Sequence, residues 1–145
     1  VPVSSLMGLA ANVTQRGAVV CPIMDARRSQ VYFGIYRITE DLPEVLLEPG
    51  AAAIEEAVSC ADRIGEEIIY IGDGVPVFED RIRVLSQGGV RFMEPVNCFQ
   101  RGASVAAVGS LLFEKKQGVK AAEFAPVYLR KSQAEREREE AGNVS

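Results

Sequence analysis

Histidine is absent from this sequence of 145 residues. Because histidine is the usual general base and the commonest metal ligand near neutral pH, its absence argues against a catalytic triad and against a histidine-bound metal. Only three cysteines are present, Cys21, Cys60 and Cys98, and they are far apart and lack CxxC spacing. We therefore expect neither a disulfide framework nor a zinc site, and no cofactor. Three reduced thiols are typical of a cytoplasmic protein.

Long apolar runs are also lacking. No stretch of about 18 apolar residues occurs, so we expect no membrane-spanning helix, and no signal peptide is visible. Basic residues are in the minority, with 16 Lys and Arg against 20 Asp and Glu and a formal net charge of -4. A chain of this charge lacks the basic footprint that binds nucleic-acid phosphates, so any RNA is expected to be held by a partner.

The remaining composition is that of a folded domain. Apolar residues make up 48% and charged residues 25% of the chain. The length fits a single domain, for which about 100–200 residues is usual. The sequence opens on Val1 and a helix start, so we interpret Val1 as a fragment boundary, with further chemistry outside the chain.

Apolar patterns predict an α/β domain. Strands are predicted at residues 18–24 and 31–38, and the short turn between them predicts an antiparallel hairpin. Further strands are predicted at residues 45–47, 68–71 and 90–93. Helices are predicted at residues 6–13 (capped by Ser4 or Ser5 and ended by Gly17), 51–64, 78–85 and 103–116 (ended by Gly118). Helices alternating with strands after an antiparallel opening predict a mixed sheet flanked by helices.

A polar turn with one acid and two arginines joins the first two strands. It reads Asp25-Ala26-Arg27-Arg28-Ser29-Gln30 and precedes Val31-Tyr32. One interpretation is an Asx-type turn, in which Asp25 accepts backbone N–H groups and Arg27 makes an ion pair or hydrogen bonds within the protein. The other is an arginine fork that binds a carboxylate or a phosphate. The sequence favours the first, because Asp is a common turn former.

Glycines follow the strand Ile68–Ile71, in the order Gly72-Asp73-Gly74. Glycines after a parallel strand let a nucleotide approach the backbone closely. The spacing matches neither GxGxxG nor GxxxxGK[ST], so these three residues are a weak nucleotide-site candidate. A plain strand-to-helix turn is the favoured interpretation.

The end of the chain changes in character. Pro126 forces an extended backbone, which predicts a short strand or clamp that packs Tyr128 and Leu129 onto the core before Arg130. Residues 133–140 interleave Arg with Glu and lack an apolar face, which predicts a solvated helix or frayed tail, with partner docking as the alternative. The change in pattern near residue 130 predicts one domain followed by a charged tail at 131–145.

No nucleophile is placed beside a base in this sequence. The serines lack their usual activator, histidine, and the three cysteines have no evident basic neighbour. Composition and spacing therefore predict no catalytic residue.

Three segments, taken in order, resemble the TsaB family, also called YeaZ, whose members are subunits in tRNA threonylcarbamoyladenosine biosynthesis. They are Val3-Ser4-Ser5-Leu6-Met7, the DAR-x-x-[EQ]-VY element at residues 25–32, and Pro126-Val127-Tyr128-Leu129-Arg130. The resemblance covers essentially the whole chain but not the front half of the family. It marks Asp25, Arg27, Arg28, Gln30, Tyr32, Tyr128 and Arg130 as structural or interaction residues.

The resemblance implies an α/β fold of the actin-like, RNase H-like (ASKHA) type, with this chain as its second lobe. The predicted domains are then an interlobe helix at 1–16, the C-terminal lobe at 17–130 and the charged tail at 131–145. It implies a non-catalytic scaffold subunit that partners the catalytic subunit TsaD, with the ATPase TsaE as a third component in bacteria. Together these proteins modify the adenosine beside the anticodon, so tRNA is expected to be contacted only through the complex. Homodimerisation is also compatible with the resemblance. The family's older label as a glycoprotease-like peptidase finds no support in these residues.

A second function class remains open at this point. The chain could be the second lobe of an active ASKHA-type small-molecule kinase or carbamoyltransferase, with its catalytic residues in the missing front lobe. In ASKHA ATPases a glycine pair after a second-lobe strand supports the adenosine. Gly72-Asp73-Gly74 departs from that pair by the acid between the glycines, which argues against nucleotide binding.

Overall fold

The predicted antiparallel hairpin is present in the computed structural model, which describes residues 1–129, 135 and 138. β1 (Val19–Asp25) and β2 (Gln30–Arg37) pair antiparallel, with Val19 opposite Arg37 and Asp25 opposite Val31. Their β-branched and aromatic residues are almost all buried, which is why they form strands rather than surface loops. This prediction is confirmed.

The hairpin forms the middle of a five-stranded mixed sheet in the described part of the chain. Its strand order is β3-β2-β1-β4-β5. β3 pairs antiparallel with β2, whereas β4 pairs parallel with both β1 and β5. The remaining elements are α1 (Ser5–Ala10), β3 (Glu44–Ala53), α2 (Ile54–Asp62), β4 (Ile68–Ile71), α3 (Val75–Leu85), β5 (Val90–Phe92), α4 (Gly102–Glu114) and two 3₁₀ turns, Pro95–Asn97 and Ala121–Glu123. The predicted fold class, a mixed sheet with an antiparallel opening flanked by helices, is confirmed.

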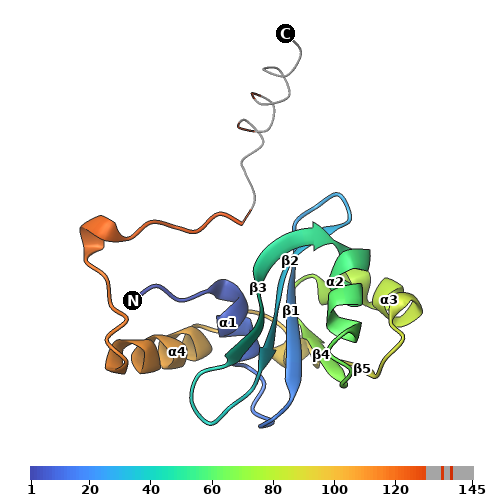
Figure 1. Ribbon diagram of the computed structural model, residues 1–145, viewed down its shortest axis with the longest axis horizontal. Helices are drawn as coiled ribbons and strands as arrows, with labels where there is room; N and C mark the ends of the chain where they lie inside the picture. The colour runs from blue at the N-terminus through green and yellow to red at the C-terminus, as the bar shows by residue number, and fades with distance from the viewer. Residues whose placement is uncertain (130–134, 136–137, 139–145) are drawn as a thin grey trace.

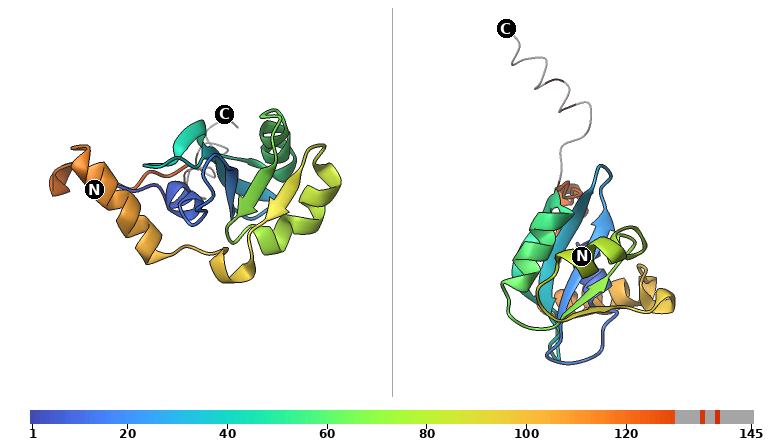
Figure 2. Two further views of the ribbon diagram at one scale, coloured as in Figure 1. Left: turned by 90° about the horizontal axis from the view of Figure 1, so that it is seen from below. Right: turned by 90° about the vertical axis from the view of Figure 1, so that its right-hand side faces the viewer.

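Helices cover both faces of this sheet (Figures 1 and 2). α2 and α3 pack on one face, and α1 packs on the other with α4 outside it. α4 approaches α1 closely at Gly8, where an added Cβ would lie 2.9 Å from Cγ2 of Val105. The core therefore lies on both sides of β1 and β4, because residues 19–23 of β1 and all of β4 are buried.

Helix starts differ from the predicted ones where hydrogen bonding to the sheet competes with helix propensity. Residues 51–53, predicted as helix, belong to β3 because they pair with residues 30–32 of β2. The third strand is correspondingly longer than predicted, and α2 begins only at Ile54. α3 begins earlier than predicted, at Val75, because Pro76 fits the first turn of a helix, where no N–H is needed.

Helix ends also differ at two predicted glycines. α1 has the predicted cap at Ser4, but it ends at Ala10 rather than continuing to Gly17. α4 is not ended by Gly118. Lys116 takes the left-handed conformation instead, with a φ of 60°, and the N–H of Gln117 donates to the carbonyl of Leu112 at 3.0 Å. The helix therefore closes two residues earlier, in a Schellman-type turn.

Within the described residues, no helix is both long and apolar enough to cross a membrane. Arg130 and most of the predicted charged tail, residues 131–134, 136–137 and 139–145, lie outside the described residues. The division of the chain into an interlobe helix, a lobe and a tail stays a prediction.

Candidate functional site

Two turns meet at the carboxyl ends of neighbouring parallel strands. β1 and β4 run in parallel, so the turn after Asp25 and the turn after Ile71 lie at the same edge of the sheet. The backbone N–H of Asp25 donates to Oδ1 of Asp73 at 3.1 Å. The backbone N–H of Gly74 donates to the carbonyl of Ile23, also at 3.1 Å. These two hydrogen bonds fix the turns to each other.

The turn between β1 and β2 is held by Asp25 and by its own backbone. Oδ1 of Asp25 accepts a hydrogen bond from the N–H of Arg27 at 2.9 Å. The N–H of Gln30 donates to the carbonyl of Arg27 at 3.0 Å, and the carbonyl of Ser29 accepts from the N–H of Ile54, the first residue of α2, at 3.1 Å. The prediction that Asp25 organises this turn is confirmed.

Three consecutive residues of this turn have left-handed backbone conformations. The φ angles of Arg27, Arg28 and Ser29 are 65°, 52° and 58°. Arg28 and Ser29 occupy the two central positions of the hydrogen-bonded turn, where Asn-Gly is the usual choice because those residues tolerate positive φ. Each non-glycine residue in this region costs roughly 1–2 kcal/mol. Local backbone preference therefore does not explain why arginines stand here.

The two arginine side chains lie exposed at the end of the hairpin. Neither makes a hydrogen bond or an ion pair with any residue that the structure describes. The predicted ion pair or side-chain hydrogen bond of Arg27 is therefore wrong within the described part of the chain. The physical reason is that the turn holds both side chains exposed to solvent, where water can solvate the guanidinium groups. Asp25 and Asp73 instead accept backbone N–H groups.

Gly72 and Gly74 are required by the packing of their own turn against β1. Gly72 has a φ of 116°, and an added Cβ would lie 2.1 Å from the carbonyl oxygen of Ile23. At Gly74 an added Cβ would lie 3.1 Å from the same oxygen. The turn joins β4 to α3, as the strand-to-helix interpretation predicts. The assignment of Gly72, Asp73 and Gly74 to a weak nucleotide site stays a prediction.

Two thiols near these strands are shielded from solvent. Cys98 is 2% exposed and its thiol donates to the carbonyl of Gly72 at 3.2 Å. Burial raises the pKa of Cys98 and also raises the pKa of Cys21 far above the ordinary value. Thiols that stay protonated at neutral pH are poor nucleophiles and poor metal ligands. Among the described residues, no group of three or more acidic, cysteine or histidine side chains could hold a metal ion.

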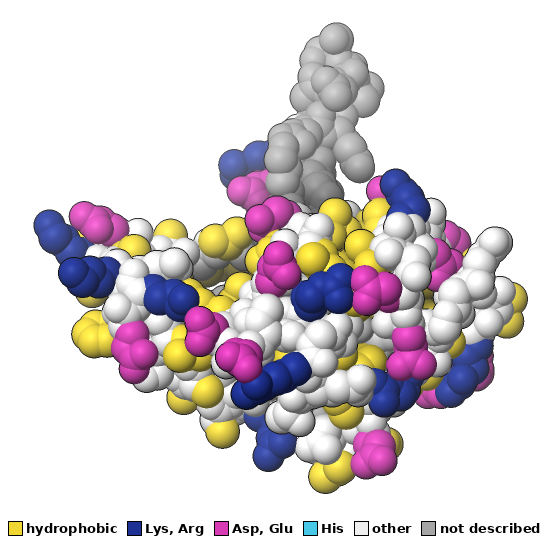
Figure 3. Space-filling model, turned by 60° about the horizontal axis from the view of Figure 1, so that its bottom comes forward, with side chains coloured by type: hydrophobic (Ala, Val, Ile, Leu, Met, Phe, Trp, Pro, Cys, Tyr) yellow, Lys and Arg dark blue, Asp and Glu magenta, His cyan; other side chains and the backbone are white. Residues whose placement is uncertain are grey.

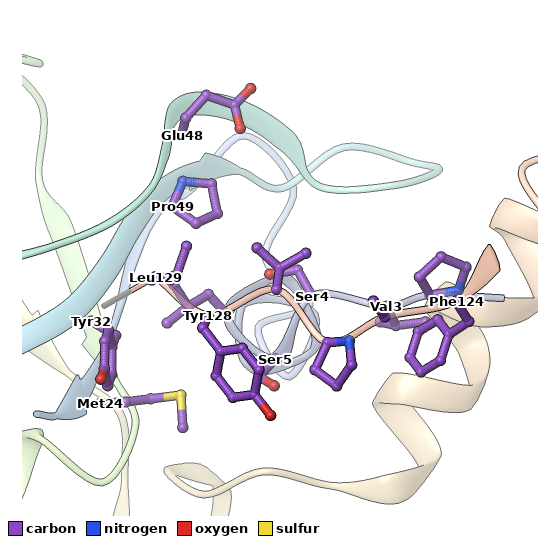
Figure 4. Close-up of a pocket in the computed structure, with 15 residues that line it drawn as sticks. Val3, Ser4, Ser5, Met24, Tyr32, Glu48, Pro49, Phe124, Tyr128 and Leu129 are labelled. Atoms are coloured by element: carbon purple, nitrogen blue, oxygen red, sulfur yellow. The ribbon is translucent and has the colours of Figure 1, made fainter. Parts of the chain in front are cut away.

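An apolar groove of about 720 Å³ opens beside the hairpin, at the same end of the sheet (Figure 4). It is lined by residues 2–6, Met24, Tyr32, Glu48, Pro49 and residues 124–129. Met24 and Tyr32 are opposite each other on β1 and β2. Each of the three segments that carry the family resemblance therefore contributes to the groove wall, the second of them through Tyr32. More than half of the chain separates the second segment from the third.

The last described segment runs along this groove without forming a strand. Tyr128 is 82% exposed and Leu129 is 36% exposed, so the predicted packing of these residues onto the core is wrong, as is the predicted strand. The segment follows α4, which packs outside α1, and this course brings it to the groove rather than to an open edge of the sheet. Its apolar side chains remain available for contact with another molecule.

The candidate residues named from the sequence thus fall into two neighbouring groups. Tyr32 and Tyr128 line the apolar groove, and Asp25, Arg27, Arg28 and Gln30 lie at the end of the hairpin beside it. Arg130 lies outside the described residues.

Met24, Glu48 and Pro49 also belong to the groove wall, but the sequence patterns do not mark them as a site. Met24 is predicted only as strand, and Glu48 and Pro49 lie outside the predicted strand at 45–47. The available signal was Pro49, because proline in a strand marks an edge. β3 is indeed an edge strand of the sheet.

Comparison with known proteins gives structural likeness without sequence-level matches. No protein-family model matches the chain, and no curated protein sequence matches it. YeaZ from Pseudomonas aeruginosa superposes with a TM-score of 0.68 at 22% sequence identity. A second structure, an uncharacterized protein with similarity to peptidase YEAZ from the same organism, superposes with a TM-score of 0.66 at 21% identity.

Both likenesses extend over most of this chain and just over half of the compared proteins. Each alignment covers 88% of this chain and 57% of the other one. The chain therefore has the fold of YeaZ, over a little more than half of the length of those proteins.

Proposed function

We propose that this chain is the second lobe of a TsaB (YeaZ) protein, and that it serves as a non-catalytic subunit of the bacterial tRNA threonylcarbamoyladenosine synthase. Its partners are a TsaD-like catalytic subunit and a TsaE-like ATPase, and tRNA is contacted only through the complex, in the cytoplasm. The fold shared with YeaZ supports this proposal. So does the match of three ordered sequence segments to the family pattern.

One observation carries the proposal: the three matching segments converge on the apolar groove. Residues kept only for core packing would be buried, but Val127 and Tyr128 are 85% and 82% exposed. An exposed apolar surface of this kind is typical of a protein–protein contact. A subunit that works by contact, rather than by its own chemistry, accounts for that exposure.

The non-catalytic role is supported by the state of the nucleophiles. Cys21 and Cys98 are buried and their pKa values are raised, which leaves both thiols protonated near neutral pH. Asp73 and Asp25 are engaged by backbone N–H groups rather than paired with each other as an acid and a base. The described residues therefore offer structural rather than catalytic roles at this edge of the sheet.

Affinity measurements with the full-length protein and its TsaD-like subunit test the proposal. Val127→Asp places a charge on the groove segment and is expected to weaken the complex at least tenfold. Val84→Asp is a matched control, because Val84 is equally exposed, at 85%, but lies on α3. The control is expected to bind as the wild type does.

A reconstituted modification assay tests the non-catalytic role. The TsaD-like and TsaE-like proteins are expected to modify tRNA only when the full-length protein is added, and the full-length protein alone is expected to be inactive. Turnover of ATP or carbamoyl groups by the full-length protein alone would instead favour the active ASKHA-type enzyme. Absence of any complex with the TsaD-like subunit would contradict the proposed function.

A further inference from the structure

Arg27 and Arg28 are exceptional among the arginines of residues 1–129. Each of the others makes a hydrogen bond or an ion pair with a described residue: Arg16 with Glu40, Arg37 with Glu66, Arg63 with Ser59, Arg81 with Glu55, Arg83 with Glu79, Arg91 with Glu67 and Arg101 with Asn97. The guanidinium groups of Arg27 and Arg28 have no such partner in the described part of the chain. Their donors are therefore available to a ligand.

The backbone holds these two arginines in a conformation that other residues would adopt more easily. Both have positive φ, at 65° and 52°. Glycine or asparagine would relieve the steric cost, which is roughly 1–2 kcal/mol per residue. Strain of this kind, observed at an exposed position with no internal contact to explain it, is characteristic of a functional site.

The turn is also fixed in place. Its hydrogen bonds reach Asp73 in the neighbouring turn and Ile54 at the start of α2, besides those within the turn itself. A fixed turn loses little backbone entropy when a ligand binds. Less of the free energy gained from hydrogen bonds to the arginines is therefore offset by ordering the backbone. Arg27 and Arg28 are thus preorganised for binding.

The arginines lie beside the apolar groove. Arg27 follows the groove residue Met24 by three positions, so the start of the turn lies at most about 11 Å along the chain from the groove wall. Apolar and aromatic side chains in the groove, with cations at its border, form the usual composition of a protein interface, in which Tyr and Arg contribute most. The apolar groove and the two arginines therefore have the composition of a single docking surface.

The charge of the surroundings selects the ligand. The protein carries a formal net charge of -4, and Asp25 and Asp73 lie at the base of the turn. Figure 3 brings forward the end of the molecule that lies at the bottom of Figure 1, away from this turn, and on that face Lys and Arg are also interspersed with Asp and Glu, without a continuous basic area. A phosphate backbone would meet repulsion beyond these two cations, whereas individual carboxylates on a folded partner match the planar guanidinium groups. The geometry therefore favours a protein ligand over a nucleic acid.

We propose that Arg27 and Arg28 are an anchor for acidic side chains of the protein that docks at the apolar groove. This inference rests on the proposed function, and the partner is then the TsaD-like catalytic subunit. The carboxylates lie on the partner, next to the apolar residues that enter the groove. Each guanidinium group donates two charge-assisted hydrogen bonds to one carboxylate of the partner.

Titration of the full-length protein against the TsaD-like subunit tests the anchor. The double variant Arg27→Asn/Arg28→Asn removes both charges, and asparagine tolerates positive φ, so the turn should keep its shape. We expect at least a tenfold weaker complex and a melting temperature no lower than that of the wild type, because asparagine also relieves the steric cost of positive φ. Raising the salt concentration should weaken the wild-type complex more than that of the variant, because ion pairs are screened.

The matched control is Arg16→Asn/Arg63→Asn, which removes two charges at the opposite end of the sheet and should bind within twofold of the wild type. If the wild type binds and the Arg27/Arg28 variant binds equally well, the anchor is overturned and the proposed function is retained. If the wild type forms no complex, the proposed function itself fails. Binding of tRNA by the full-length protein alone, lost in the Arg27/Arg28 variant, would overturn the protein anchor in favour of a phosphate site.

Discussion

The backbone N–H of Asp25 donates a hydrogen bond to Oδ1 of Asp73, 48 residues further along the chain, at 3.1 Å. This bond joins the turn that carries Arg27 and Arg28 to the turn that carries Gly72 and Gly74. It also occupies Asp73, the acid that stands between the two glycines. The bond therefore links the stability of the sheet edge to the position of Arg27 and Arg28.

Replacement of Asp73 tests this link. Asp73→Ala removes the acceptor and is expected to lower the free energy of unfolding by about 0.5–1.5 kcal/mol, the usual net value of one hydrogen bond. Asp73→Asn retains an oxygen acceptor at the same place and should be close to the wild type. Urea denaturation of the two variants measures the difference. Equal losses in both would show that the carboxylate charge, and not the hydrogen bond, is what the turn requires.

Gly72→Ala is expected to be strongly destabilising. A methyl group there would lie 2.1 Å from the carbonyl oxygen of Ile23, and this contact involves backbone that cannot move without disturbing β1. We expect a loss of more than about 3 kcal/mol, from steric overlap added to the cost of positive φ. Gly65→Ala is the control, since Gly65 also has positive φ, at 75°, but has no atom within 4 Å of the added Cβ.

Gly65→Ala should lose only the conformational cost, roughly 1–2 kcal/mol. Chemical denaturation of both variants gives the comparison. A loss at Gly72 no greater than the loss at Gly65 would contradict the close packing of the turn on β1.

The protein is expected to lose stability at alkaline pH. Burial raises the pKa of Cys21, so the folded state keeps this thiol neutral while the unfolded chain releases its proton at an ordinary pKa of about 8.5. The neutral Cys21 thiol contributes fully to stability below its pKa in the unfolded chain. This contribution is lost as the pH rises toward its pKa in the folded protein. In that window each such group lowers the free energy of unfolding by up to about 1.4 kcal/mol per pH unit.

In Cys21→Ala the free energy of unfolding should fall less steeply between pH 9 and pH 10, because about one proton fewer is released on unfolding. This window follows from the unfolded pKa of about 8.5. Val19→Ala, a buried truncation on the same strand, should lower stability without changing this slope. Burial also raises the pKa of Tyr36 and of Tyr70, so part of the decline is expected to remain in every variant. Unchanged slope in Cys21→Ala would refute the assignment.

This chain is expected to bind no ATP on its own. The two glycines of the candidate turn pack against Ile23, and the carboxylate between them would repel a phosphate. A ligand present at 100 times its dissociation constant stabilises a protein by about 2.7 kcal/mol, so binding would be visible as a higher melting temperature. Millimolar Mg-ATP should leave the melting temperature unchanged. A clear rise that disappears in Gly74→Val would establish a nucleotide site at this turn and count against the scaffold role.

The sequence alone was sufficient to predict those features that depend only on residues within one short segment. Residues 18–24 and 31–38 are rich in β-branched and aromatic residues, so the opening hairpin could be predicted from them. Asp25 accepts the N–H of a residue two positions later, which is a contact within the turn itself. Ser4 likewise caps the helix that begins beside it. Each of these depends on neighbours in the sequence.

Tertiary structure decided the features that depend on distant residues. Residues 51–53 are favourable for a helix, yet they form strand because β2 offers hydrogen-bond partners. The Arg27 side chain has no partner among residues 1–129 because the folded turn holds it exposed to solvent. That turn is fixed in part by Asp73, far along the chain, which accepts the N–H of Asp25. The apolar groove exists only because α1, the hairpin and the segment after α4 come together. A sequence pattern records which side chains prefer burial or a turn, but the packing of whole elements determines which of them meet.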